Sequence, residues 1–410
     1  MVSKTSKMGG RSAVVVGGGI GGLAAAVALR QVDWRVTVLE RAARFGEIGA
    51  GITLMSNGLR CLDAIGLGEA VRGSGLPMLA LGMRTSAGRW LSRIDADGAG
   101  MQARMGTTAV VIHRAELHTI LRDALPAASL LAGVATTAII GGADGGPAQV
   151  HFRHQDHDAV LHADLVVGAD GVHSWIRAQR WPDAPAAVYS GSTTWRAITT
   201  PSPAAVTEMS LSWGQGTEFG VMPIADGRTY WYAAANADEA QRNLDELREL
   251  RRRFGTWHEP IPALLAATRP QDVLRHDVAE LAAPLPSFHR GRVVLLGDAA
   301  HPMTPNLGQG ACQALEDAAV ISRLAAGIGP DAVTGMLARY TAARVPRTTD
   351  VVRWSRRAAT MTTWASPPAV ALRNTVAWLT GRIAPGAALR GLAAIYGWQP
   401  PAAGRLGDAG

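Results

Sequence analysis

The stretch VVVGGGIGGLAAAVALR, residues 14–30, constrains the fold of this chain more than any other segment. β-Branched residues lead into a run of glycines, and helix-forming residues follow directly. Gly17, Gly19 and Gly22 have the spacing G-x-G-x-x-G. The first glycine permits a tight turn, the second lets a pyrophosphate approach the backbone, and the third lets the helix lie close to the strand. The stretch predicts a dinucleotide-binding turn; the alternative is a glycine turn that serves packing alone.

An acidic residue stands where such a turn requires one. Glu40 ends the next β-branched run, RVTVLE, and a carboxylate there can bind ribose hydroxyls. The N-terminus of the predicted helix offers unpaired N–H groups and a partial positive charge to phosphate. Arg41 is a candidate for binding a 2′-phosphate, or a surface charge. These residues leave open whether the ligand is FAD or NAD.

The pattern of strands and helices changes along the chain. Short β-branched runs alternate with helical segments over residues 11–39, and an apolar strand pattern returns as RVVLLGD at residue 292. This alternation predicts a parallel sheet with crossover helices. Residues 189–235 form short alternating segments separated by turn signals, which is typical of antiparallel strands. We therefore predict an α/β fold: a Rossmann-like domain with an inserted, mainly antiparallel sheet and helices at the C-terminal end.

Composition and charge exclude several classes of protein. The chain has 410 residues, 48% of them hydrophobic, which is typical of folded domains. Its net charge is +7, but the basic residues alternate with acids along a predicted surface helix, so no nucleic-acid partner is predicted. Two cysteines exclude a disulfide framework and a cysteine metal site, and no metal is predicted.

No signal peptide or apolar run of about 18 residues is present, so we predict a cytoplasmic protein without a transmembrane segment. The apolar stretch over residues 358–398 is interrupted by prolines and arginines. It fits packed helices or a peripheral membrane contact, and packing is favoured.

Two later motifs supply further candidate ligand-binding residues. LVVGADGVHSWIR, residues 165–177, ends a strand with Asp170 and Gly171. RVVLLGDAAHPMTPNLGQGACQALEDA, residues 292–318, puts Asp298 at the carboxyl end of a strand, where open α/β sheets bind ligands. The glycines around Gln309 then open a second helix. Two helix N-termini suit a cofactor with a pyrophosphate at one end and an electron-accepting ring at the other. The alternatives are a helix cap at Asp298 and an ordinary turn at Asp170.

With HRAEL at residues 113–117, these motifs resemble the group A FAD-dependent aromatic hydroxylases, flavoprotein monooxygenases with the p-hydroxybenzoate hydroxylase fold. The resemblance covers roughly residues 12–344 and implies an FAD-binding domain with an inserted substrate-binding sheet. We assign residues 1–76, 106–184 and 277–330 to the FAD-binding domain, residues 77–105 and 185–276 to the sheet domain, and residues 331–410 to a C-terminal helical region.

The resemblance also implies which residues hold FAD. The ADP half would lie on Gly17, Gly19, Gly22 and Glu40. Arg114 would reach the cofactor from the side, Asp170 and Gly171 would contact a pyrophosphate, and Asp298 would bind the ribityl region. The isoalloxazine would be bordered on one side by Pro305, Gly308, Gln309 and Gly310, and on the other by Gly49, Ala50 and Gly51. Met55 and Ser56 depart from the family, in which Trp-Pro is frequent at that place.

The reaction implied is hydride transfer from NAD(P)H to FAD, formation of a flavin C4a-hydroperoxide with O₂, and hydroxylation or epoxidation of a small aromatic or polycyclic substrate. An oxidase or reductase that inserts no oxygen, and a flavin-binding redox sensor without enzymatic activity, are the alternatives. A monomer or a homodimer is expected.

The substrate is expected between the flavin and the inserted sheet. Alternate residues of a strand share a face, so Tyr230 and Tyr232 should point the same way, with Trp231 opposed. Core packing is the favoured role for each aromatic residue of the sheet, Trp195 and Phe219 included. Arg196 is a candidate for binding a substrate carboxylate, or a solvated surface arginine. Glu218 or His301 could remove a proton, although His301 is favoured as part of the flavin loop, and no catalytic residue is assigned. The candidate pocket residues are Arg196, Glu218, Met222, Tyr230 and Tyr232.

Overall fold

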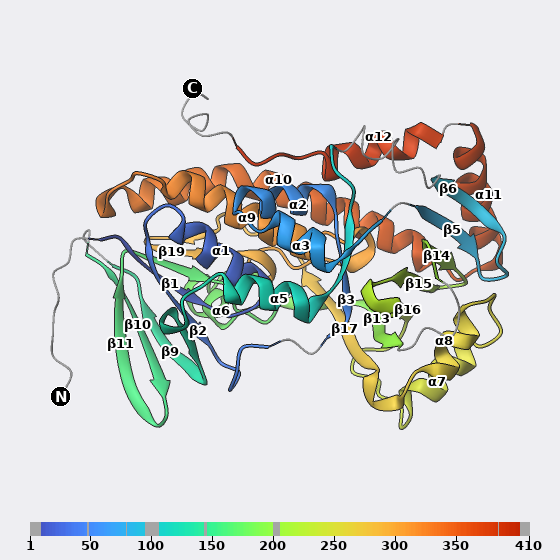
Figure 1. The fold of residues 1–410 in the computed structure, drawn as a ribbon, viewed down its shortest axis with the longest axis horizontal. Coiled ribbons are helices and arrows are strands. Elements are labelled where there is room, and N and C mark those ends of the chain that lie inside the picture. Colours follow the sequence, from blue (N-terminus) through green and yellow to red (C-terminus); the bar gives the residue numbers. More distant parts are fainter. Residues whose placement is uncertain are drawn as a thin grey trace.

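The computed structural model describes residues 10–46, 49–78, 80–94, 106–142, 146–199, 206–383 and 385–401, arranged in two lobes. In Figure 1 the lobe that contains β1 lies on the left and the lobe that contains β13–β16 on the right, with the long helix α10 (Val333–Thr362) above them. Each lobe is built around its own sheet.

The left lobe contains a six-stranded sheet in the order β18-β19-β12-β1-β2-β8. All its pairs are parallel except β18 with β19. Helices α1 (Ile20–Arg30) and α9 (Gly310–Ala325) pack on each other, and a Cβ placed on Gly21 would lie 3.0 Å from Ala314 Cβ. The predicted Rossmann-like α/β fold is confirmed. The strands are β1 (Ser12–Val16), β2 (Arg35–Glu40), β8 (Leu130–Ala132), β12 (Leu165–Gly168), β18 (His289–Arg290) and β19 (Val293–Leu295).

Two small sheets and several helices complete this lobe. One sheet has the order β11-β10-β9, and the strands β9 and β11 are absent from the sequence-based assignment. The other has the order β3-β7-β4 and carries the HRAEL motif at the end of β7. The elements are β3 (Gly51–Leu54), β4 (Leu76–Pro77), β7 (Val110–His113), β9 (Val134–Ile140), β10 (Ala148–His154), β11 (His157–Ala163), α2 (Ser56–Ala64), α3 (Gly68–Ser74), α5 (Arg114–Asp123) and α6 (Trp175–Arg180).

The right lobe is a seven-stranded sheet in the order β17-β13-β16-β15-β14-β5-β6. Its pairs are antiparallel except β14 with β5. Strand β17 continues the sheet to Leu281, so we place the boundary of this lobe after that residue and not at residue 276. Residues 95–105, also assigned to this lobe, lie outside the described residues. The strands are β5 (Leu81–Thr85), β6 (Trp90–Ile94), β13 (Ala187–Thr199), β14 (Met209–Trp213), β15 (Thr217–Pro223), β16 (Thr229–Asn236) and β17 (Leu274–Leu281).

The two faces of the seven-stranded sheet have different neighbours. Trp195, Phe219 and Trp231 pack against α7 (Glu246–Phe254) and α8 (Ile261–Ala267), with the rings of Phe219 and Trp231 stacked 5.3 Å apart. Trp195 and Phe219 therefore belong to the core of this lobe, which is the role favoured for them from the sequence. Because side chains alternate along a strand, neighbouring candidates on the same strands face the other lobe.

The C-terminal helices connect the lobes. α10 packs against α9, while α11 (Pro367–Ile383) packs against β6 and α12 (Pro385–Tyr396) against α2. Packed helices are thus present, as favoured from the sequence. None of the described helices is long and apolar enough to cross a bilayer.

Candidate active site

The glycine turn after β1 has the geometry that its spacing predicts. Gly17 has φ +110°, a conformation that favours glycine. A Cβ on Gly22 would lie 2.0 Å from the Gly17 carbonyl oxygen, so the helix can approach the turn only with glycine there. A Cβ on Gly19 would meet no atom within 4 Å. The backbone at Gly19 therefore borders open space, as the approach of a pyrophosphate requires.

Glu40 lies directly against this turn. Its Oε2 accepts a hydrogen bond of 2.6 Å from the Gly18 amide, and its Oε1 accepts one of 2.7 Å from the Ala42 amide. His118 also reaches the turn, with Nε2 2.8 Å from the Gly18 carbonyl oxygen. Glu40 thus stands beside the glycines as predicted, while Arg41 is exposed.

A second helix N-terminus lies beside the first. α9 begins at Gly310, and neither α1 nor α9 receives a side-chain cap, so the amides of both first turns are free of such caps. Asp298, on the 3₁₀ turn η4 (Gly297–Ala299), is exposed and lies 3.8 Å from a Cβ placed on Gly310. Asp298 is therefore not the cap of α9. Two uncapped N-termini and one exposed carboxylate at the same sheet edge fit a cofactor that carries a pyrophosphate and a hydroxylated chain.

The Asp170 carboxylate is occupied by local hydrogen bonds. It accepts from Ser174 Oγ at 2.5 Å and from the Ile176 amide at 2.9 Å, at the start of α6. The buried Arg177, not singled out from the sequence, donates to the Ala299 carbonyl at 2.7 Å and to the Val172 carbonyl at 2.6 Å. Arg177 thus links the Asp170 motif to the Asp298 turn. The predicted contact of Asp170 and Gly171 with a pyrophosphate stays a prediction.

The loop of Gly49, Ala50 and Gly51 lies between the two lobes. A Cβ on Gly49 would lie 1.9 Å from the His113 ring, and one on Gly51 would lie 2.3 Å from the Tyr230 ring. The Arg114 amide donates to the Ala50 carbonyl at 2.9 Å. Close neighbours therefore leave no room for a side chain at Gly49 or Gly51. The loop joins the HRAEL motif to the seven-stranded sheet.

The loop before α9, defined here as residues 304–309 and called the 304–309 loop, includes the turn η5 (Pro305–Leu307) and Gly308 with φ +61°. The side chain of Gln309 is fully buried and accepts from Asn57 Nδ2 at 2.9 Å and from Gln313 Nε2 at 3.0 Å. The side chain of Gln309 therefore points into the protein, and a cofactor ring outside can contact only the backbone of this residue. Met55 borders the same loop, since its Cε lies 3.6 Å from a Cβ placed on Gly308.

A buried ionic network supports α9 behind that loop. Arg344 donates to Asp317 Oδ1 and to Glu316 Oε2, both at 2.6 Å, and all three side chains are at most 1% exposed. Burial acts to raise the pKa of Asp317, but His301 and Arg344 outweigh it and lower this pKa to about 2. The network therefore holds Asp317 ionised and α9 fixed against α10.

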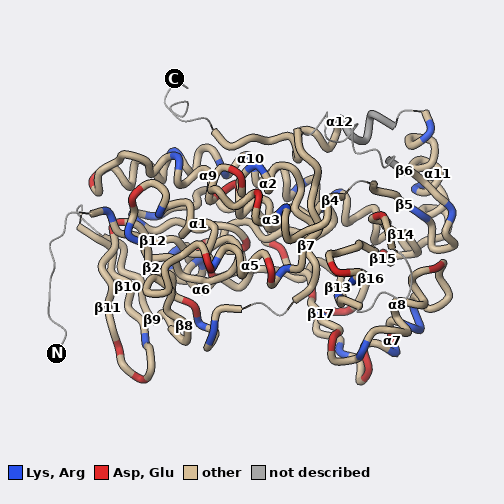
Figure 2. Tube along the Cα trace, in the orientation of Figure 1, with Lys and Arg blue, Asp and Glu red and all other residues tan. Residues whose placement is uncertain are grey.

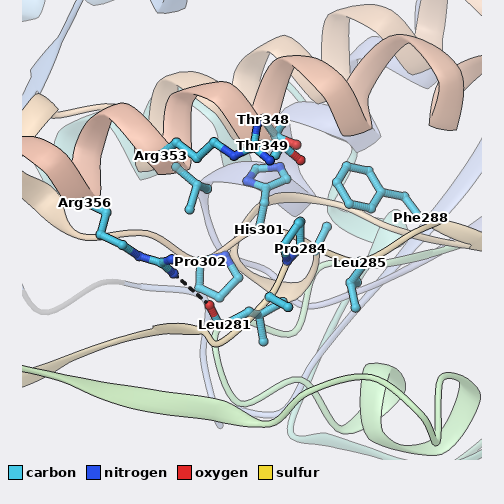
Figure 3. Close-up of a pocket in the computed structure, with 13 residues that line it drawn as sticks. Leu281, Pro284, Leu285, Phe288, His301, Pro302, Thr348, Thr349, Arg353 and Arg356 are labelled. Atoms are coloured by element: carbon cyan, nitrogen blue, oxygen red, sulfur yellow. Dashed lines mark hydrogen bonds between the residues drawn. The ribbon is translucent and has the colours of Figure 1, made fainter.

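His301 is part of this network and borders another cavity than Glu218 and Tyr232 do. Its Nε2 is 2.7 Å from Asp317 Oδ2, and its ring borders a cavity of about 70 Å³ with Phe288, Pro302 and Arg356 (Figure 3). Glu218 and Tyr232 line a different cavity. The position of His301 thus does not support it as the base that removes a substrate proton.

The face of the seven-stranded sheet that meets the left lobe carries the other pocket candidates. Tyr230 and Met222 belong to an apolar cluster with Ala50, Met55 and Cys312, into which Tyr232 also packs. As predicted, Tyr230 and Tyr232 share this face, with ring centroids 6.5 Å apart. These apolar side chains join the glycine loop to the seven-stranded sheet.

Glu218 is the buried acid of this face. It is 4% exposed, accepts from the Tyr232 hydroxyl, and accepts from Trp213 Nε1 at 2.9 Å. Burial raises the pKa of the Glu218 carboxyl, and burial together with Glu218 raises that of the Tyr232 phenol. Glu218 and Tyr232 line a cavity of about 30 Å³ whose other walls include Thr304, Pro305 and Asn306. This pair of side chains therefore faces the 304–309 loop directly.

Arg196 supplies positive charge to the same face. Burial raises the pKa of the Tyr230 phenol, and the positive charges of Arg196 and Arg114 oppose that rise. No carboxylate of the described residues pairs with Arg196. Its guanidinium is thus available for an anionic oxygen of a ligand.

Comparison with known proteins decides the family. A family model described as "FAD binding domain" matches residues 11–355. The aurachin C monooxygenase/isomerase of Stigmatella aurantiaca is 37% identical over 358 residues, covering 87% of this chain and 90% of that protein. This chain belongs to the FAD-dependent aromatic monooxygenases.

Further members of this monooxygenase family agree in length and fold. The 2-heptyl-3-hydroxy-4(1H)-quinolone synthase of Pseudomonas aeruginosa is 34% identical over 391 residues, covering 92% of this chain and 96% of that protein. The crystal structure of Klebsiella pneumoniae HpxO complexed with FAD and uric acid is 28% identical, has a TM-score of 0.82 and covers 92% of this chain and 95% of its own. The resemblance to group A hydroxylases and the prediction of FAD as cofactor are confirmed.

Sequence reasoning missed several residues that hydrogen-bond to the candidate site residues or to the turns that carry them. Arg177 stands inside a quoted motif, and a buried arginine there is signalled only by the apolar residues around it. Asn57 carries no local signal, because its partner Gln309 lies 252 residues further along the chain. Trp213 is only five residues from its partner Glu218, but the sequence pattern does not show that the two residues are paired across β14 and β15. Only the folded arrangement identifies them.

Proposed function

We propose that this chain is an NAD(P)H-dependent FAD monooxygenase that hydroxylates or epoxidises a small aromatic or polycyclic substrate bearing an N–H or O–H group. The observation that carries the proposal is the shared cavity in which Glu218 and Tyr232 face residues 304–306. The names of two relatives, a 2-heptyl-3-hydroxy-4(1H)-quinolone synthase and a 3-amino-4-hydroxybenzoate 2-monooxygenase, support substrates with such groups.

The cofactor site fits FAD on this chain's own residues. The open space at Gly19, the two uncapped helix N-termini and the exposed Asp298 would hold its pyrophosphate and ribityl parts. When bound, FAD supplies the redox chemistry of the reaction, the acceptance of hydride from NAD(P)H and the activation of dioxygen. The protein supplies binding, orientation and the exclusion of water.

The apolar face of the sheet would orient the aromatic ring. Met222 and Tyr230 lie in the cluster that meets Ala50 and Met55, so a ring held there is removed from water and faces the glycine loop. Arg196 would stabilise negative charge on a substrate oxygen. A ring whose oxygen carries more negative charge is more electron-rich and therefore reacts more readily with an electrophilic oxidant.

Glu218 and Tyr232 would move the substrate proton. The substrate N–H or O–H would pass its proton to the Tyr232 hydroxyl oxygen, while Tyr232 passes its own proton to Glu218 Oε1, its hydrogen-bond acceptor. Because burial raises the pKa of Glu218, this carboxylate is a stronger base than an exposed one. Ser190 and Thr363 border both this cavity and an open surface hollow, which gives the proton a path to solvent.

The deciding experiment follows labelled oxygen. The FAD-loaded protein is incubated with NADH or NADPH and ¹⁸O₂ over a panel of phenols, aminophenols and quinolones, each paired with its O-methyl or N-methyl derivative. We expect ¹⁸O in the product of the parent compounds and about 100-fold slower turnover of the methylated partners, which have no proton to give. Product without ¹⁸O would establish the oxidase alternative, and equal rates within each pair would refute the proton role.

The variant Glu218→Gln tests whether Glu218 accepts the proton. It keeps the shape of the side chain but cannot accept the Tyr232 proton, so we expect turnover to fall about 100-fold. Glu280→Gln is the matched control, because Glu280 is also a buried carboxylate of this sheet but pairs with Arg356. An equal loss in both variants would show a disturbance of the sheet and not a role in proton transfer.

A further inference from the structure

An apolar stripe runs along the outer face of helix α11. Four large side chains at helical spacing are exposed: Leu372 (60%), Val376 (53%), Leu379 (40%) and Ile383 (78%). We call these four residues the α11 stripe. Residues three and four apart on a helix share a face, so the stripe is continuous along the helix. Exposed apolar side chains that line up in this way mark an interaction site.

The opposite face of α11 anchors the helix to the right lobe. Arg373 is 4% exposed and donates to the Gly214 carbonyl at 2.9 Å and to the Met361 carbonyl at 3.1 Å. Gly381 packs on β6, since a Cβ there would lie 2.9 Å from the Leu91 carbonyl oxygen. The helix lies at the edge of the molecule beside β5 and β6 (Figure 1). The outward direction of the stripe is therefore set by buried polar contacts on the inner face.

The charged residues of α11 have one sign. Residues 367–383 contain no aspartate or glutamate, and Figure 2 shows blue but no red along α11. Arg382 of this helix lies over the Trp378 ring at 4.8 Å. Tryptophan and arginine are the residues that prefer the boundary between lipid headgroups and acyl chains.

We propose that the α11 stripe is a peripheral membrane-binding surface that inserts into the headgroup region of an anionic lipid bilayer. An amphipathic helix of this kind lies in the plane of the interface, with its apolar side chains among the upper acyl chains and its basic residues at anionic headgroups. The bilayer would hold the seven-stranded sheet near lipid, so an apolar aromatic substrate dissolved in the membrane would be close to the lobe that binds it.

A second copy of the chain fits the stripe less well than a bilayer. A two-fold dimer through this face would bring the same patch of both copies together, and α11 carries Arg382 and no acid to pair with it. A stable interface also buries about 800 Å² per partner, whereas the stripe consists of four side chains on one helix. A bilayer accepts a narrow apolar stripe and an unpaired positive charge.

Vesicle binding of the full FAD-loaded chain tests the proposal without any substrate. Sedimentation is measured with vesicles of phosphatidylcholine alone and of phosphatidylcholine mixed with phosphatidylglycerol. We expect binding to the mixed vesicles, weakened by salt, and a loss of roughly 10-fold or more in the partition coefficient of the double variant Leu372→Gln/Ile383→Gln. Arg382→Gln should weaken binding to the anionic vesicles only.

The double variant Ile140→Gln/Leu244→Gln is the matched control, because both residues are exposed, at 52% and 112%, and lie outside α11. Equal partition of the stripe variant and the wild type would overturn the proposal. A dimer that wild type forms without vesicles, detected by sedimentation velocity, and that the stripe variant does not form would also overturn the proposal. Since partition is measured without turnover, a failure of the proposed oxygenation would leave this result unchanged, and the reverse also holds.

Discussion

Gly19 and Gly22 belong to one motif, but glycine is favoured at the two positions for different physical reasons. Gly22 is required by the folded chain itself, since its Cβ position lies 2.0 Å from a backbone oxygen. Gly19 is not, because nothing lies within 4 Å of its Cβ position. The FAD-free protein does not require glycine at position 19, and this position belongs to a phosphate-binding motif. We therefore attribute Gly19 to the binding of the ligand.

We therefore expect Gly19→Ala to fold normally and to bind FAD at least about 10-fold more weakly, as its methyl group enters the space of the pyrophosphate. Gly22→Ala should destabilise the protein with or without FAD. The measurements are FAD titration by flavin fluorescence and thermal unfolding of the FAD-free protein. Gly335→Ala, at another glycine with open surroundings, is the control. Normal FAD affinity in Gly19→Ala would contradict the assigned approach of the pyrophosphate.

The Glu218 carboxyl predicts a pH dependence of stability. Burial raises its pKa in the folded protein above the unfolded value of about 4.3. A group with a raised folded pKa contributes stability that is present below the unfolded pKa and is lost as pH rises through the folded pKa. Wild type should therefore lose stability relative to Glu218→Gln as pH rises above the unfolded pKa and through the raised folded pKa.

Urea unfolding of both proteins across this pH range is the measurement. A difference in the free energy of unfolding that stays constant with pH would show that Glu218 keeps an ordinary pKa. Because Glu218→Gln is also expected to slow turnover, the same substitution should raise stability at alkaline pH while lowering activity. This combination is typical of a buried acid retained for function.

At the scale of elements, α9 and α10 are joined by buried charge. Arg344 of α10 is the partner of Glu316 and Asp317 on α9, and replacing it leaves carboxylates buried without their main cation. We expect Arg344→Met to lower the free energy of unfolding by about 3–5 kcal/mol. Arg353→Met, on the same helix with a side chain 65% exposed, should change it by less than about 0.5 kcal/mol.

Chemical denaturation of both arginine variants gives the comparison. Similar small effects would mean that the buried network adds nothing to stability. Because α9 opens beside Asp298 and the 304–309 loop, a loosened α9 should also release FAD more readily, which flavin fluorescence detects.

The strands of the right lobe show what the sequence pattern of one element can predict. Alternation placed Tyr230 and Tyr232 on one face and Trp231 on the other, as the structure has them. It could not say which of the two faces meets the cofactor lobe. Only the structure shows that α7 and α8 cover the face that carries Trp195 and Phe219.

At the scale of the whole molecule, the cofactor site draws on segments far apart in the chain. The glycine turn, the Asp298 turn and the N-terminus of α9 come together at one sheet edge. A ligand that binds there favours the folded state over the unfolded one. We expect FAD at 100 times its dissociation constant to raise the free energy of unfolding by about 2.7 kcal/mol.

Removing FAD should accordingly lower the unfolding temperature, and returning it should restore the original value. Differential scanning fluorimetry over a series of FAD concentrations measures the shift. Gly19→Ala should need a higher FAD concentration for the same shift. An unfolding temperature that does not respond to FAD would mean that FAD does not bind the folded chain preferentially.

The sequence by itself determined the nucleotide-binding turn, because the residues that make it are neighbours in the chain. Gly17 and Gly22 contact each other within a single strand–turn–helix unit, so their spacing carries the geometry. Tertiary structure alone decided the substrate side of the site. It set Tyr230 against Gly51 and placed Glu218 and Tyr232 around one cavity with Thr304, and no local pattern relates these residues. The turn follows from local sterics, whereas the pocket exists only where two separately built lobes meet.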